Sequence, residues 1–268
     1  MIQQKNSLKY ITFQNLENTN AVKHCVTTRL GGISTGIYAE FNLSFSRGEE
    51  AEKVLQNYDI LCDTLDFDKN SFVLCHQTHT TNIRVVTEQD RGMGVTKVST
   101  IKNTDGLITN IPGIQLVVFC ADCVPILLFD PNKKAVAAIH AGWRGTVNGI
   151  AQKAIEKMQE NYGTNPKDII AGIGPSIGQC CFQVDKPVVK EFREKLAFAN
   201  DVILKDTVPE RYKIDLWETN KRILMDCGVE QNNIEFTKIC TMCHTDLFYS
   251  HRVMGNDRGN MAGIIALK

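Results

Sequence analysis

Residues 115–158 read QLVVFCADCVPILLFDPNKKAVAAIHAGWRGTVNGIAQKAIEKM. Three apolar runs in this segment, at 116–119, 126–129 and 135–139, have the length and composition of buried β-strands. The turn Asp130-Pro131-Asn132 separates the second run from the third. The pattern predicts strands in the core of the molecule and leaves the polar residues of the segment at the strand ends.

A helix is expected directly after these strands, with Gly163 as its end. Arg144, flanked by glycines, lies at the start of this helix, where free N–H groups and the helix dipole favour an anion. The apolar residues that would share its buried face are Val147, Ile150, Ala151, Ala154, Ile155 and Met158.

The loops of this segment carry four chemically useful side chains, namely Asp122, Cys123, His140 and Arg144. Taken singly, Cys123 is typical of a small buried hydrophobe, and His140 of a hydrogen-bonded strand terminus in a core hairpin. Taken together, the carboxylate, thiol, imidazole and guanidinium favour a functional site.

The composition fits one large domain or two small ones, because the chain has 268 residues, and its 30 basic and 30 acidic residues balance. The overall charge therefore gives no indication of binding to nucleic acid or to an anionic membrane. The N-terminus lacks the features of a signal peptide, and no apolar run is long enough to span a membrane. We expect a soluble cytoplasmic protein whose ten cysteines are reduced and mostly packing residues.

The rest of the chain mixes strand and helix patterns without strict alternation. Helical periodicity covers 49–66, and Asp185 and Asp215 are expected caps of two further helices. Further strands are expected at 10–13, 71–74, 83–86, 169–173 and the C-terminal end. No repeat or low-complexity linker divides the chain, so the pattern favours a single α+β domain over residues 1–268, with mixed sheets layered with helices.

A second polar cluster, Gln77-Thr78-His79, follows the expected strand at 71–74. At strand spacing His76 and His79 would face opposite sides, so we expect one of them in a given site. His79, Cys123 and His140 form a candidate zinc set, because zinc accepts thiolate and imidazole together and three ligands leave one position open.

Two Cys-x-x-Cys pairs, Cys120/Cys123 and Cys240/Cys243, also invite a zinc interpretation. The pairs lie far beyond the spacing of a zinc ribbon, so this signal is weak.

Five motifs follow one another along the chain: Gln77-Thr78-His79, Ala121-Asp122-Cys123-Val124-Pro125, His140-Ala141-Gly142-Trp143-Arg144-Gly145, Gly174-Pro175-Ser176-Ile177-Gly178 and Cys240-Thr241. In this order they resemble the family once called multicopper polyphenol oxidases or YfiH-like laccase-domain proteins, now known as purine nucleoside phosphorylases with adenosine deaminase activity. The resemblance also includes 28–32 and Asn42-Leu43, so it covers nearly the whole chain.

The resemblance implies a YfiH-like, cysteine-hydrolase-like fold and a zinc ion bound by His79, Cys123 and His140. Members of the family phosphorolyse adenosine, inosine and 5'-methylthioadenosine to the base and the ribose 1-phosphate, and they deaminate adenosine. The partners would be purine nucleosides and phosphate, and we expect a monomer or weak homodimer. The implied substrate contacts are Arg29, Asn42, Gln77, Arg144 and His251.

Within this reaction scheme Asp122, Arg144 and Cys123 are the candidate catalytic residues. Deamination would use a water activated by zinc to attack C6 of adenine, with Asp122 carrying the proton or orienting its corner of the chain. Phosphorolysis would bring phosphate to C1' of the ribose, and Arg144 is the natural clamp for that phosphate.

Three other functions were weighed against this one. A four-copper oxidase needs many more histidines, with His-x-His pairs, than the six of this chain, so oxidase activity would come from Cu²⁺ at the same thiolate and imidazole ligands. A cysteine hydrolase or peptidoglycan-editing amidase would use Cys123 as nucleophile and His140 as base. A scaffold protein would hold a purely structural zinc.

Overall fold

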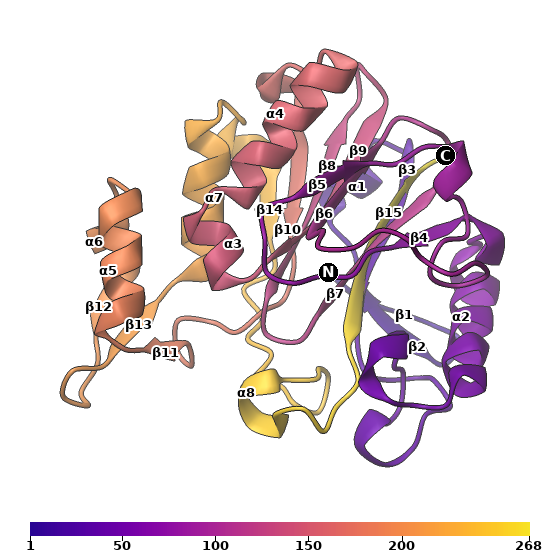
Figure 1. Ribbon diagram of the computed structural model, residues 1–268, viewed down its shortest axis with the longest axis horizontal. Coiled ribbons are helices and arrows are strands. Elements are labelled where there is room, and N and C mark those ends of the chain that lie inside the picture. The colour runs from indigo at the N-terminus through magenta and orange to yellow at the C-terminus, as the bar shows by residue number, and fades with distance from the viewer.

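The computed structural model describes all 268 residues, which form two six-stranded sheets and a smaller three-stranded sheet (Figure 1). In spatial order the first sheet consists of β1 (Ile2–Lys5), β2 (Leu8–Ile11), β3 (Val22–Thr27), β15 (Met261–Leu267), β7 (Gln115–Cys120) and β4 (Phe72–Leu74). The second sheet consists of β14 (Ile234–Phe236), β10 (Ile170–Ile173), β8 (Val124–Asp130), β9 (Ala135–Ala141), β6 (Gly106–Thr109) and β5 (Ile83–Val85). The third consists of β11 (Gln183–Val184), β13 (Tyr212–Ile214) and β12 (Ile203–Lys205). Both large sheets pair strands in parallel and antiparallel directions, which confirms the expected α+β fold with mixed sheets.

Eight α-helices pack around the three sheets. They are α1 (Gln14–Glu17), α2 (Ala51–Leu65), α3 (Trp143–Val147), α4 (Ile150–Tyr162), α5 (Lys186–Lys195), α6 (Ala199–Val202), α7 (Leu216–Asp226) and α8 (His251–Met254). In Figure 1 α2 lies on one side of the molecule and α3, α4 and α7 on the other, while α5, α6 and the third sheet form a projecting lobe. None of these helices combines the length and the apolar character that a membrane crossing requires.

The central strands are apolar along their whole length because both of their faces are buried. In β8, Ile126 and Leu128 pack in the cluster that includes α4 and α7, whereas Leu127 and Phe129 pack in the cluster between the two sheets. Side chains alternate along a strand, so a strand with helices on one face and a second sheet on the other needs apolar residues at every position. This explains the continuous apolar runs of the sequence.

The corner between β7 and β8 carries the chain from one sheet to the other. The hairpin of this segment is formed by β8 and β9, which pair antiparallel from Val124↔Ala141 to Asp130↔Ala135. The first run does not take part in this hairpin, because β7 pairs with β15 and β4 in the first sheet. As a result the end of β7, the start of β8 and the end of β9 meet at one edge of the two sheets.

The helix expected after β9 is two helices, α3 and α4, with a break at Asn148-Gly149. Gly149 has φ 75, a left-handed conformation that an α-helix does not continue through, and it caps the start of α4. The expected end at Gly163 is confirmed, since Gly163 has φ 69 and caps the C-terminus of α4. The periodicity at 49–66 is confirmed as α2.

Candidate metal centre

The three side chains of the candidate zinc set come together from three parts of the chain. His79 lies in the loop after β4, Cys123 lies at the β7–β8 corner, and His140 lies in β9. Their ligand atoms all lie within 4.8 Å of one another, and Cys123 Sγ is 3.8 Å from His79 Nε2. A tetrahedral zinc ion would place a sulfur and a nitrogen ligand about 3.5 Å apart. The cluster therefore has the size that one ion requires.

A buried aspartate, Asp105, contacts two of these three residues, His140 through its ring and His79 through its backbone. Its carboxylate lies 2.8 Å from His140 Nδ1, which leaves Nε2 of that ring for a metal. The same carboxylate accepts the backbone N–H groups of Thr78, His79 and Thr80 and the hydroxyl of Thr80. Asp105 was missed from the sequence, where it was only part of a turn before a strand.

The protonation states of the cluster follow from its mutual contacts. Burial would raise the pKa of Cys123, but His140 and His79 lower it to about 6. Burial would lower the pKa of His140, but Cys123 and Asp105 raise it to about 9. Burial would raise the pKa of Asp105, but hydrogen bonds from His140 and Thr80 lower it to about 2. Cys123 is thus a thiolate beside an imidazolium at neutral pH, and a divalent cation would displace the imidazolium proton.

The backbone around the cluster allows this close approach. A side chain at Gly142 would bring its Cβ within 2.8 Å of His79 Cδ2 and 3.1 Å of Cys123 Sγ, so only glycine fits there. His79 itself has φ 62 in a loop with no strand between 75 and 82. The strand-spacing argument for His76 and His79 is therefore wrong, although it correctly expected one of the two histidines in the cluster.

Two cavities meet at the cluster, with volumes of about 510 and 640 Å³. His79, Cys123 and His251 line both of them. The first cavity also has aromatic, aliphatic and guanidinium groups in its wall, including Trp143, Arg144, Phe182, Val188, Arg211 and Arg252. The second has no Asp or Glu in its wall and includes Arg47, Gln77, His140, Arg258 and Asn260.

Several arginines of these cavities have free hydrogen-bond donors. The guanidinium of Arg144 stacks on Trp143 with its central carbon 4.4 Å from the ring centroid, and it has no ion-pair partner. The Nε atoms of Arg47 and Arg258 are buried without a hydrogen-bond partner. Arg144 therefore offers the first cavity a guanidinium that no acidic side chain neutralises.

Residues 23–268 match the family model described as multi-copper polyphenol oxidoreductase laccase. The chain belongs to this family. Purine nucleoside phosphorylase YlmD of Bacillus subtilis (strain 168) is 36% identical over 256 residues, which cover 95% of this chain and 92% of that protein. Adenosine deaminase RL5, from an unknown prokaryotic organism, is 33% identical over 244 residues, covering 91% of this chain and 93% of that one. The crystal structure of Bacillus licheniformis hypothetical protein YfiH superposes with a TM-score of 0.93 at 34% identity, covering 100% and 99% of the two chains.

Asp122 of this laccase-domain protein is held by donors on both carboxylate oxygens. It accepts hydrogen bonds from the hydroxyls of Thr241, at 2.6 Å, and Ser250, at 3.0 Å, and from the backbone N–H of Arg252. Asp122 adopts φ 81 at the corner that carries Cys123. These contacts fit the orienting role, because they fix the carboxylate to Thr241 and to the start of α8.

Gln77 and His251, two further residues expected to contact substrate, lie at the second cavity. The side-chain amide of Gln77 pairs with the backbone N–H and C=O of Phe119, which attaches the His79 loop to β7. His251 Nδ1 lies 2.9 Å from the backbone oxygen of Gly255 at the end of α8. Both side chains border space in which a ligand fits.

Arg29 and Asn42 lie outside both cavities of this laccase-domain protein. Arg29 donates to the backbone oxygens of Ala39 and Thr245, and Asn42 Oδ1 accepts the N–H groups of Ser44 and Asn260. These bonds attach the loop after β3 to the C-terminal segment. As substrate contacts Arg29 and Asn42 stay predictions.

Proposed function

We propose that this protein is a zinc-dependent enzyme that phosphorolyses adenosine, inosine and 5'-methylthioadenosine and deaminates adenosine to inosine. The observation that supports a metalloenzyme is the set of His79, Cys123 and His140, which has three ligands and opens onto two cavities. The substrate class comes from relatives named purine nucleoside phosphorylase and adenosine deaminase.

The donor set fits zinc better than a harder cation, because it joins one thiolate to two imidazoles and contains no carboxylate. A bound zinc would supply a Lewis acid with an open fourth position. Cu²⁺ would compete for the same ligands in vitro. The oxidase activity suggested by the name of the family would have this origin.

The walls of the first cavity suit the two substrates. Trp143 and Phe182 offer flat apolar surface to a purine, and Arg144 offers a guanidinium for phosphate. We assign Asp122 the positioning of Cys123 through its bonds to Thr241 and Ser250. The acceptor of the proton during deamination is then left to water or to His251, the histidine that lines both cavities.

The Arg144→Ala variant should lose phosphorolysis about 10- to 100-fold and deamination less than about threefold, because only phosphorolysis needs an anion to be held. The measurement is the rate of adenine release and of inosine formation from adenosine at several phosphate concentrations. Arg193→Ala, which removes a surface arginine that lines neither cavity, is the matched control. Equal losses of rate in phosphorolysis and deamination would contradict a phosphate-specific role for Arg144.

The proposed function is tested with purified protein and adenosine, with and without phosphate. Inosine, adenine and hypoxanthine are followed, and the metal content is measured on the same preparation. Base release that requires phosphate, together with inosine formation that does not, is the expected result. If a protein that contains zinc leaves adenosine unchanged, the proposed reactions are wrong but the metal site is still supported.

A cysteine hydrolase is the second candidate, because the His140 contact already lowers the pKa of the Cys123 thiol. The two functions differ in the reactivity of Cys123, since a zinc-bound thiolate is poorly alkylated and a catalytic thiolate reacts quickly. We expect iodoacetamide to modify Cys123 at least about tenfold faster after chelation. Mass spectrometry of the labelled peptide measures the rate, and rapid labelling that chelation does not change would favour the hydrolase.

A further inference from the structure

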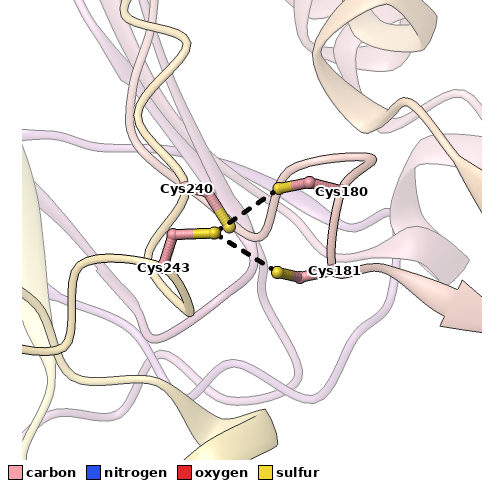
Figure 2. Close-up of side chains that lie close together, drawn as sticks. All are labelled: Cys180, Cys181, Cys240 and Cys243. Carbon is pink, nitrogen blue, oxygen red and sulfur yellow. Dashed lines mark hydrogen bonds between the residues drawn. The ribbon is translucent and has the colours of Figure 1, made fainter.

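Four cysteines outside the His79–Cys123–His140 cluster meet at one place on the structure. Cys180 and Cys181 come from the loop after β10, and Cys240 and Cys243 come from the segment before α8 (Figure 2). The four Sγ atoms all lie within 4.8 Å of one another. Cys180 and Cys243 are exposed, so packing does not explain why these positions are cysteines. Packing was expected of most of the ten cysteines, and it does not account for this group.

We propose that Cys180, Cys181, Cys240 and Cys243 form a second metal site, which binds one structural Zn²⁺. Tetrahedral zinc with Zn–S bonds of about 2.3 Å places its sulfur ligands about 3.8 Å apart. Cys243 Sγ lies 3.7 Å from Cys180 Sγ and 3.4 Å from Cys181 Sγ. Both distances are close to that value, so the four sulfur atoms are grouped as one shared ion requires.

The same distances argue against the other uses of four cysteines. A disulfide requires a sulfur–sulfur distance of about 2.05 Å. An iron–sulfur cluster with several irons spreads its cysteines over different metal atoms, and so holds them farther apart than one shared ion does. Four soft thiolates around a single tetrahedral position are the donor set of a structural zinc site.

The backbone holds the two cysteine pairs in this arrangement. Ser176 and Cys240 form a parallel β-bridge, and the N–H of Thr241 donates to the backbone oxygen of Ser176 at 3.0 Å. The N–H of Gly178 donates to Cys240 Sγ at 3.2 Å. A hydrogen bond to the sulfur stabilises a thiolate and orients it, as partners of metal ligands commonly do.

The position of the cysteine site suggests what a bound ion would do. Phe182, the residue after Cys181, and the nearby Val184 line the first cavity, while Thr241 follows Cys240 and binds Asp122. A zinc ion here would fasten the wall of that cavity, and the lobe of α5, α6 and the third sheet beyond it, to the body of the protein. With four protein ligands the site has no open position, which is typical of a structural rather than a catalytic zinc.

The test is the metal content of the full chain purified without chelator. Cys243→Ser should lose about one zinc per chain relative to the wild type, because a hydroxyl does not replace the thiolate. Cys123→Ala should lose zinc only from the other cluster, and both changes together should leave none. Cys62→Ser, a substitution of a half-buried cysteine on α2, is the matched control and should keep the full content.

This comparison separates the cysteine site from the proposed enzyme. If Cys123→Ala keeps all the zinc while Cys243→Ser loses it, the result supports the cysteine site. It contradicts a zinc ion at the His79–Cys123–His140 cluster, on which the proposed function depends. A wild type whose zinc disappears completely in Cys123→Ala would overturn the cysteine site. A disulfide among the four residues in the freshly purified protein, or the visible absorption of an iron site, would overturn it as well.

A second measurement does not depend on the variants being folded. In the native wild type we expect Cys180, Cys181, Cys240 and Cys243 to resist alkylation as a group and to become reactive together when zinc is chelated. Peptide mass spectrometry after labelling gives the modified fraction at each position. Fast labelling of the exposed Cys180 and Cys243 in zinc-loaded protein would contradict the site, because bound thiolates react poorly.

Discussion

Cys123→Ala should lose the zinc of the His79–Cys123–His140 cluster and at least about a hundredfold of its activity in both phosphorolysis and deamination. Removal of a mere partner of a metal ligand commonly costs 10- to 100-fold, and the loss of a ligand should exceed that. The thiolate is the only anionic ligand of the cluster, so its removal also leaves the cation without charge compensation. Metal analysis and initial rates with adenosine measure the two losses.

The control for this variant is Cys62→Ser, which removes a thiol from α2 and should retain both the zinc and the two activities. Thermal unfolding of both variants shows whether the fold survives. Full phosphorolysis by a Cys123→Ala protein that has lost its zinc would mean that the metal serves deamination alone, or neither reaction.

Asp105→Asn should weaken zinc binding about 10- to 100-fold, although Asp105 is not a proposed ligand. Its carboxylate accepts the His140 Nδ1 proton and holds the backbone of the loop at His79. The side-chain amide of asparagine would place its own N–H group against the N–H donors that the carboxylate now accepts, at a position that is 0% exposed. This unfavourable contact should lower the free energy of unfolding by about 1–3 kcal/mol. Competition with a coloured chelator measures the affinity, and urea unfolding measures the stability.

Asp90→Asn is the matched control, because Asp90 is also a buried carboxylate held by hydroxyl and backbone donors, and it lines neither cavity. It contacts no proposed zinc ligand side chain, so this variant should lose stability and keep its zinc affinity within about threefold. Similar losses of affinity in the two variants would show that buried charge in general, and not the bond to His140, supports the metal.

The arrangement at the site could be predicted only in part. The proposed ligands His79, Cys123 and His140 were identified through their motifs, and the structure brings their side chains together. Asp105 was missed, because a single aspartate in a turn has no local signal and acts through a bond to a strand 35 residues away in the chain. Arg258 was missed as a cavity residue for the same reason, since only the tertiary structure places it in the wall of the same cavity as Cys123.

The cysteine site could also not be predicted from local sequence. The pair Cys240/Cys243 was compared only with Cys120/Cys123, at a spacing unlike that of a zinc ribbon, and Cys180-Cys181 was not considered as a metal ligand pair. The segments meet because β10 and β14 are parallel neighbours in the second sheet, and the residues that follow both strands leave its same edge. The pairing of two strands, rather than the spacing of four cysteines, decides the proximity.

The sequence by itself determined the strands of the central segment, the helices α2 and α7, and which side chains carry the chemistry. Each of these depends on local periodicity, on helix caps or on residue type. Such signals come from residues close together in the sequence and need no contact with the rest of the chain. Only the tertiary structure decided that β7 and β8 belong to different sheets. It also decided that Asp105 contacts His140 and that the four cysteines lie close together. Contacts between distant segments are set by how the whole core packs, because many local arrangements satisfy the same apolar pattern and only one of them buries every face at once.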